Sequence, residues 1–233
     1  MRSKCVLAVG AAMAVLALLP ASVALAGSSA PVTVRVEGAN RPLLSTTTVK
    51  THAGSLTRFG APRGDCSDET AAGALDAATH HRWKAIWESS FNDYEVTSIL
   101  GETHTFASKK DFWEIFVNGV AAQTGACEIK VKPGEQLLFA AVPQKGATER
   151  PLVIQDYPRH ATVGESFNLR VFAYTDKGRT GRVPGAEVSG DGVHATANRF
   201  AVATITPSKP GNLVLRAAKS GFVRSAPVTV HVS

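Results

Sequence analysis

The sequence predicts an α+β domain followed by an all-β domain. In the first half of the 233-residue chain, strand patterns surround one alanine-rich helical stripe, whereas the second half shows only strand and turn patterns. Strands repeat apolar residues every second position and helices about every 3.6 positions, so the two halves have different periodicities. We therefore divide the chain into residues 1–26, 27–143, 144–150 and 151–233.

Residues 1–26 have the organisation of a secretory signal peptide. Arg2 and Lys4 form a basic start, residues 6–19 form an apolar run, and Ala24 to Ala26 supply small residues before a cleavage site. The run is shorter than the roughly 20 apolar residues that span a bilayer. The sequence predicts a secreted, extracellular protein that is not transmembrane, either released or held to the envelope by non-covalent contacts. The alternative is an uncleaved anchor.

Two cysteines, Cys66 and Cys127, remain after the predicted cleavage. An even number of cysteines in an exported chain indicates a disulfide. The competing interpretation is a pair of metal ligands, but the two residues lack CxxC spacing. We predict a disulfide between Cys66 and Cys127 and no metal site.

The formal net charge of +6 comes from basic residues that are scattered singly along the chain. A nucleic-acid-binding protein would gather them on one face with aromatic residues between them. The pattern therefore predicts no nucleic-acid partner. It suits a weak attraction to anionic cell-wall polymers.

The first half has the order two strands, one helix and three strands, which is the order of a β-grasp fold. Ser67 is expected to cap the helix, which runs to about Thr79 and places its alanines on one stripe so that it can lie close to a sheet. Asn118–Gly119 predicts a tight hairpin after the fourth strand. The predicted strands are residues 31–37, 43–50, 94–100, 112–117 and 137–142.

Residues 70–79, 112–119 and 125–138 resemble an exported bacterial family of unknown function. That family is similar to the C-terminal domain of transcobalamin and intrinsic factor, grouped with soluble ligand-binding β-grasp domains. The resemblance covers about residues 31–142 and implies a domain that contacts a ligand. In the vitamin carriers a helical barrel completes the cobalamin site, and this sequence has no such barrel. We predict no cofactor, with a corrinoid or similar flat ligand as a special case.

The second half, residues 151–233, predicts a β-sandwich. About seven short strands with regular turns fit into its roughly 83 residues, as in the cysteine-free Ig-like domains of bacterial surfaces. Examples are residues 167–173, 213–217 and 228–232. The polar linker 144–150 contains Gly and Pro and predicts some hinge freedom between the halves.

Aromatic side chains are the main candidates for a binding surface. Trp83, Trp87 and Tyr94 lie after the helix, in and beside a segment expected to form a loop, and Trp113 lies on the strand 112–117. Indole rings offer wide apolar contact and one polar N–H. Trp87 and Tyr94 are expected to be exposed because polar residues flank them. The alternative is that most of these rings fill a small core.

The strand 112–117 carries bulky residues on both faces. Phe112 and Phe116 share one face, and Trp113 and Ile115 share the other. One face is therefore expected to join the core, and the other to form a platform.

No catalytic signature is present: GxSxG, HExxH, SxxK and phosphate-binding glycine loops are all missing from the sequence. The sequence favours a non-enzymatic binding module for an unknown small ligand, with the Ig-like half as a spacer. The alternative is a structural or adhesive envelope protein that binds wall polymer or a surface protein. An extracellular hydrolase with scattered catalytic residues remains a residual hypothesis.

Overall fold

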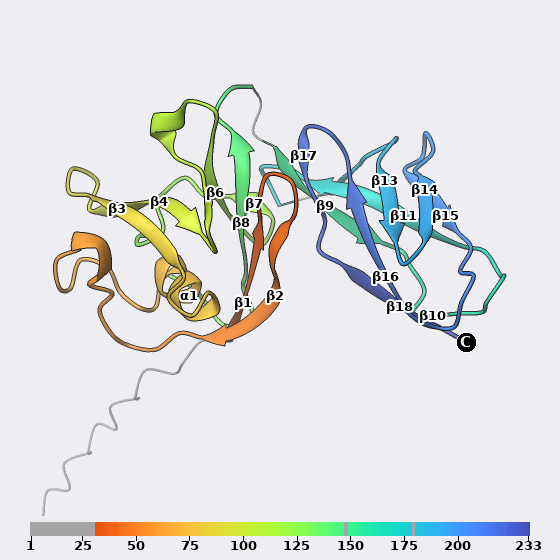
Figure 1. The fold of residues 1–233 in the computed structure, drawn as a ribbon, viewed down its shortest axis with the longest axis horizontal. Helices are drawn as coiled ribbons and strands as arrows, with labels where there is room; N and C mark the ends of the chain where they lie inside the picture. Colours follow the sequence, from red (N-terminus) through yellow and green to blue (C-terminus); the bar gives the residue numbers. More distant parts are fainter. Residues whose placement is uncertain (1–30, 147–148, 179) are drawn as a thin grey trace, which may run out of the picture.

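The computed structural model describes residues 31–146, 149–178 and 180–233, so the predicted signal peptide lies outside the described residues. These residues form two halves that lie side by side, with four sheets and one α-helix (Figure 1). The predicted fold class, an α+β β-grasp-like domain followed by an Ig-like sandwich, is wrong as stated. The first half has two separate sheets instead of one mixed sheet curled around a helix.

The larger sheet of the first half has the strand order β2-β1-β8-β6-β7. β1 runs parallel to β8, and the other neighbours are antiparallel, which makes the sheet mixed. The predicted hairpin is confirmed: Asn118 and Gly119 join β6 to β7 with φ values of 50° and 84°. The strands are β1 (Pro31–Glu37), β2 (Pro42–Lys50), β6 (Asp111–Val117), β7 (Val120–Ala121) and β8 (Gln136–Pro143).

The helix is shorter than predicted. α1 (Ala71–Ala78) is capped by the Thr70 hydroxyl, which accepts a hydrogen bond from the backbone N–H of Gly73, so Ser67 is not the cap. The predicted stripe is buried and consists of Ala71, Ala74, Leu75 and Ala78. Through it, α1 lies against β1 and β2 (Figure 1). The small side chains allow this close approach to the sheet.

The segment after α1 is a strand, not the expected loop. In β3, Trp83, Ala85 and Trp87 point inward and alternate with the exposed Lys84 and Ile86. This strand pairs with β4, and β4 pairs briefly with β5, which gives the second, antiparallel sheet of the first half. These strands are β3 (Trp83–Glu88), β4 (Asp93–Ile99) and β5 (Glu102–Thr103).

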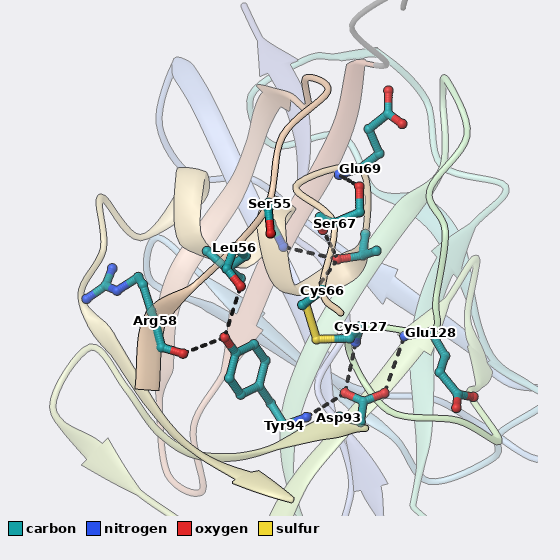
Figure 2. The surroundings of a disulfide bond; sticks show 12 residues. Ser55, Leu56, Arg58, Cys66, Ser67, Glu69, Asp93, Tyr94, Cys127 and Glu128 are labelled. Atoms are coloured by element: carbon teal, nitrogen blue, oxygen red, sulfur yellow. Dashed lines mark hydrogen bonds between the residues drawn. A yellow bond between two sulfur atoms is a disulfide. The ribbon is translucent and has the colours of Figure 1, made fainter. Parts of the chain in front are cut away.

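The predicted disulfide is confirmed. Cys66 and Cys127 are bonded, with an S–S distance of 2.07 Å and both side chains buried. The bond ties the segment before α1 to the segment after β7, and it lies beside the start of β4 (Figure 2). It therefore links the parts of the first half that the sheets do not join directly.

The second half consists of two sheets that enclose one apolar core. This all-β arrangement is compatible with an Ig-like domain, although the described residues contain ten strands and not about seven. One sheet contains β9 (Arg150–Gln155), β11 (Phe167–Tyr174), β12 (Thr180–Arg182), β15 (Val202–Ile205) and β17 (Phe222–Val223). The other contains β10 (His160–Ala161), β13 (Glu187–Gly190), β14 (Val193–Thr196), β16 (Gly211–Ala218) and β18 (Val228–Val232).

The two halves share an apolar interface. Trp113 and Ile115 of β6 face the core of the first half, whereas Phe116 packs with Leu138 of β8 and with Val223 of the second half. On the face of β6 that points away from this core, the second half therefore covers Phe116, whereas Phe112 stays half-buried. At the hairpin turn, a side chain at Gly119 would collide with the Tyr174 ring.

A buried carboxylate reinforces this interface. Glu37 is 1% exposed and accepts hydrogen bonds from Arg35 of its own strand (2.6 Å) and from Arg216 and Arg224 of the second half (both 3.0 Å). Arg224 also donates to the carbonyl oxygen of Gly38 at 2.6 Å. These contacts argue against the predicted hinge freedom. The proposed boundaries at residues 143 and 151 stay a prediction.

Candidate functional site

A groove of about 570 Å³ opens between β4 and β6. It exists because both strands have an open edge there. β4 pairs with β5 only at Ser98 and Ile99, and β6 pairs with β7 only at Phe116 and Val117. The remaining parts of both edges face the groove, and the segment that follows β7 closes its third side.

Exposed phenylalanines form the rim of the groove. Phe91, in the turn between β3 and β4, is 74% exposed, and Phe106, in the short 3-10 helix η2 (Phe106–Ser108), is 54% exposed. The Phe106 ring stacks on that of Phe112 with 4.6 Å between the centroids. Large aromatic side chains left open to water beside a concavity are typical of a contact surface.

Five carboxylates also line the groove, and no Lys, Arg or His lies among its described lining residues. Asp93 is structural: its carboxylate accepts the backbone N–H groups of Tyr94 (2.6 Å), Cys127 (2.9 Å) and Glu128 (3.3 Å), beside the disulfide (Figure 2). The other four each leave at least one carboxylate oxygen open to a ligand, although one of them, Glu95, also accepts the backbone N–H of Phe106 at 2.9 Å. They are Glu88, Glu95, Glu114 and Glu128.

Glu114 is half-buried in the groove. Its carboxylate accepts the N–H of Ile115 at 3.1 Å, folding over the open edge of β6. Burial raises the pKa of Glu114, and the hydrogen bond from Ile115 offsets that shift only in part. Burial in the groove therefore disfavours the charged form of Glu114.

Trp113 lines the groove with an unused donor. Its side chain is 6% exposed, and its Nε1 has no hydrogen-bond partner among the described residues. The ring meets that of His104 edge-on at 4.8 Å.

His104 lies between Glu102 and Asp111, at 2.8 Å from each carboxylate. Burial opposes its protonation, but the contacts with the Glu102 and Asp111 carboxylates, together with their negative charges, outweigh burial and raise the pKa of His104.

The four aromatic residues predicted as a binding surface separate in the structure. Tyr94 and Trp113 line the groove, whereas Trp83 and Trp87 do not. The predicted exposure of Tyr94 is wrong: it is 5% exposed, and its hydroxyl donates to the carbonyl oxygen of Arg58 at 2.6 Å. Burial and the nearby Asp76 raise the pKa of Tyr94 to about 12. Trp87 is half-buried and packs edge-on against Tyr94 at 5.1 Å.

Sequence reasoning missed the rim and the acidic lining. Phe91 precedes Asn92–Asp93 and follows two serines, and an apolar ring inside such a polar turn is a signal for exposure. Phe106 lies in a similar, largely polar segment, after Thr105 and shortly before Ser108 and Lys109. No comparable signal marks the glutamates, because they come together only when β4 and β6 are placed next to each other.

The groove falls within a segment that has relatives. Residues 75–141 match the family model described as a domain of unknown function (DUF4430). Every residue that lines the groove lies in this DUF4430 segment. No curated protein matches the chain.

Two further observations concern metal binding and membrane insertion. Among the described residues, no group of three or more His, Cys, Asp or Glu side chains is placed to hold a metal ion. No helix within the described ranges has the length and apolar character needed to cross a membrane.

Proposed function

We propose that this chain is a secreted, non-enzymatic binding module whose groove between β4 and β6 holds an organic ligand. The observation that carries the proposal is the pairing of a concave site with exposed rings: Phe91 and Phe106 border a groove of about 570 Å³. Ligand sites typically enclose about 300–1,000 Å³, with apolar walls and few polar groups.

Other features support the same proposal. A buried disulfide suits an oxidising compartment outside the cytosol and so supports secretion. The resemblance of residues 31–142 to the C-terminal domain of transcobalamin and intrinsic factor favours ligand contact by this half, with a corrinoid as one special case. The second half covers a face of the larger sheet, which suits the role of a spacer and support.

The alternative, a structural protein that binds wall polymer, receives less support from this site. Wall polymers that carry phosphate or carboxylate would meet like charges in a groove lined by four glutamates and Asp93. Binding of a polymer elsewhere on the molecule would leave the groove without a role.

A neutral fluorescent probe tests the proposal without regard to charge. Full-length mature protein is titrated with N-phenyl-1-naphthylamine, and we expect saturable binding of one equivalent. The double variant Phe91→Ser/Phe106→Ser should weaken binding about tenfold, because two rings lose their contact with the probe. Both positions are exposed, so the fold should survive.

Phe200→Ser is the matched control. Phe200 is a similarly exposed phenylalanine of the second half and does not line the groove. An unchanged affinity in this variant assigns the loss to the rim. Equal losses in the two variants, or no saturable binding by the unaltered protein, would contradict the proposed function.

A further inference from the structure

We infer that the groove selects an organic cation: a protonated amine or quaternary ammonium group attached to an apolar body. This inference rests on the proposed function and names the class of ligand for the same site. It follows from how charges are distributed over the molecule, from the spacing of the carboxylates and from the aromatic rim.

Three enclosed carboxylates elsewhere in the described structure have cationic neighbours within 4 Å. Glu37 contacts three arginines, Asp76 contacts Arg58 and His81, and Glu102 contacts His104. In the groove, by contrast, none of the four available glutamates lies within 4 Å of a basic side chain of the described residues. A chain with a net charge of +6 thus leaves its groove uniformly acidic.

A ligand cation would supply the missing partner. The enclosed carboxylate of Glu114 loses hydration without gaining a counter-charge. An opposite charge within about 4–6 Å favours the ionised form of a carboxylate. Binding of a cation should therefore be stronger than binding of a neutral molecule of the same shape.

The arrangement favours an organic cation over a metal ion. A metal ion needs several ligand side chains close enough to coordinate it together. The described residues contain no such group of three or more His, Cys, Asp or Glu side chains. Here the glutamates are spread around a groove whose rim carries Phe91 and Phe106. Ammonium groups bind well to aromatic faces, and quaternary ammonium ligands are commonly held by aromatic cages.

The buried indole adds a second requirement. Trp113 Nε1 is a donor without a partner among the described residues, and such a group gains from an acceptor. An oxygen atom on the apolar body of the ligand would provide one. The indole N–H is also a convenient reporter, because its NMR resonance is separate from the backbone amides.

Three small molecules of matched shape provide the test: 3-phenylpropylammonium, 3-phenylpropan-1-ol and 3-phenylpropionate. Each is titrated into the full mature chain, with affinity followed by calorimetry and by the Trp113 indole resonance. We expect the cation to bind at least tenfold more tightly than the alcohol, with the anion weakest. Added salt should reduce this preference, because it screens the carboxylates.

Glu88→Gln/Glu128→Gln is the informative variant. Neither side chain makes a hydrogen bond within the described residues, so the fold should not depend on their charge. This double variant should bind the cation about tenfold more weakly and bind the alcohol with unchanged affinity. Glu165→Gln, an exposed carboxylate of the second half, is the control and should change neither.

The outcomes separate this inference from the proposed function. Equal binding of the three molecules at the groove overturns the preference for a cation but leaves a binding module. If the cation binds equally well to Glu88→Gln/Glu128→Gln and to the control Glu165→Gln, its site lies outside the groove, and this result also overturns the inference. If none of the three binds while the neutral naphthylamine does, the cation preference is again wrong. If nothing binds at all, the proposed function fails with it.

Discussion

At the scale of single residues, Asp76 accounts for much of the aromatic cluster near α1. Its Oδ1 lies 2.6 Å from both Arg58 Nη1 and Trp83 Nε1, and its Oδ2 lies 2.6 Å from His81 Nδ1. The Trp83 ring then packs edge-on against Tyr94 at 5.4 Å. One largely buried carboxylate thus fixes the aromatic side chains behind the groove.

We predict that Asp76→Ala lowers the free energy of unfolding by about 3 kcal/mol, because it leaves a buried indole N–H and an arginine without their acceptor. Urea unfolding measures the change. Asp76→Asn should lose less, since it keeps one acceptor oxygen. Arg170→Ala, which breaks an exposed ion pair with Asp156, is the control and should cost less than about 1 kcal/mol. Similar losses in the two alanine variants would contradict this account.

The sequence drew attention to the aromatic residues of the first half but did not predict which of them are exposed. Tyr94 is flanked by polar residues, yet its hydroxyl reaches backbone that lies 36 residues earlier in the chain. Likewise, the indole of Trp83 depends on Asp76, a helix residue that nothing local marks as its partner. Burial of such side chains is decided by contacts distant in sequence, so flanking polarity is a weak guide to it.

At the scale of elements, local patterns gave the strands and the disulfide, but not the way in which the strands assemble. β1, β4, β6 and β8 were predicted close to their observed limits because turn residues bound their alternating or continuously apolar runs. β3 was missed because Trp83, Ala85 and Trp87 were treated as a loop, and with it the separate second sheet was lost. The groove was unpredictable for the same reason: it depends on where β5 and β7 stop pairing.

The disulfide offers a test at this scale. The double variant Cys66→Ser/Cys127→Ser should lose about 4 kcal/mol of stability, because an open loop of 61 residues gains entropy in the unfolded chain. Urea unfolding of the variant and of the unaltered protein, each with and without reductant, gives the value. Reductant should alter only the unaltered protein. A loss below about 1 kcal/mol would show that the contacts around Asp93 suffice.

At the scale of the whole molecule, the two halves behave as one structure. β8 is buried on both faces, with Leu137 and Phe139 in the core of the first half and Leu138 and Ala140 in the shared interface. The Glu37 cluster lies at the same boundary. A single cooperative unfolding transition is the expected consequence.

We predict that Glu37→Ala separates this transition into two in differential scanning calorimetry. The substitution leaves Arg35 buried without its counter-charge and removes the acceptor for Arg216 and Arg224, so the interface should weaken by about 3 kcal/mol. Arg150→Ala breaks an exposed pair with Asp176 inside the second half and serves as the control. A single transition in the Glu37 variant, with an unchanged midpoint, would contradict the coupling.

The shared interface also bears on the order in which the protein is made. Synthesis proceeds from the N-terminus, so Phe116 and Leu138 leave the ribosome long before Val223, the residue that packs against them. Until then, the nascent first half carries an apolar sheet face without its cover, and such faces promote aggregation. Productive folding of this chain therefore has to wait for its last strands, and a chain that ends at Pro143 would leave that face permanently uncovered.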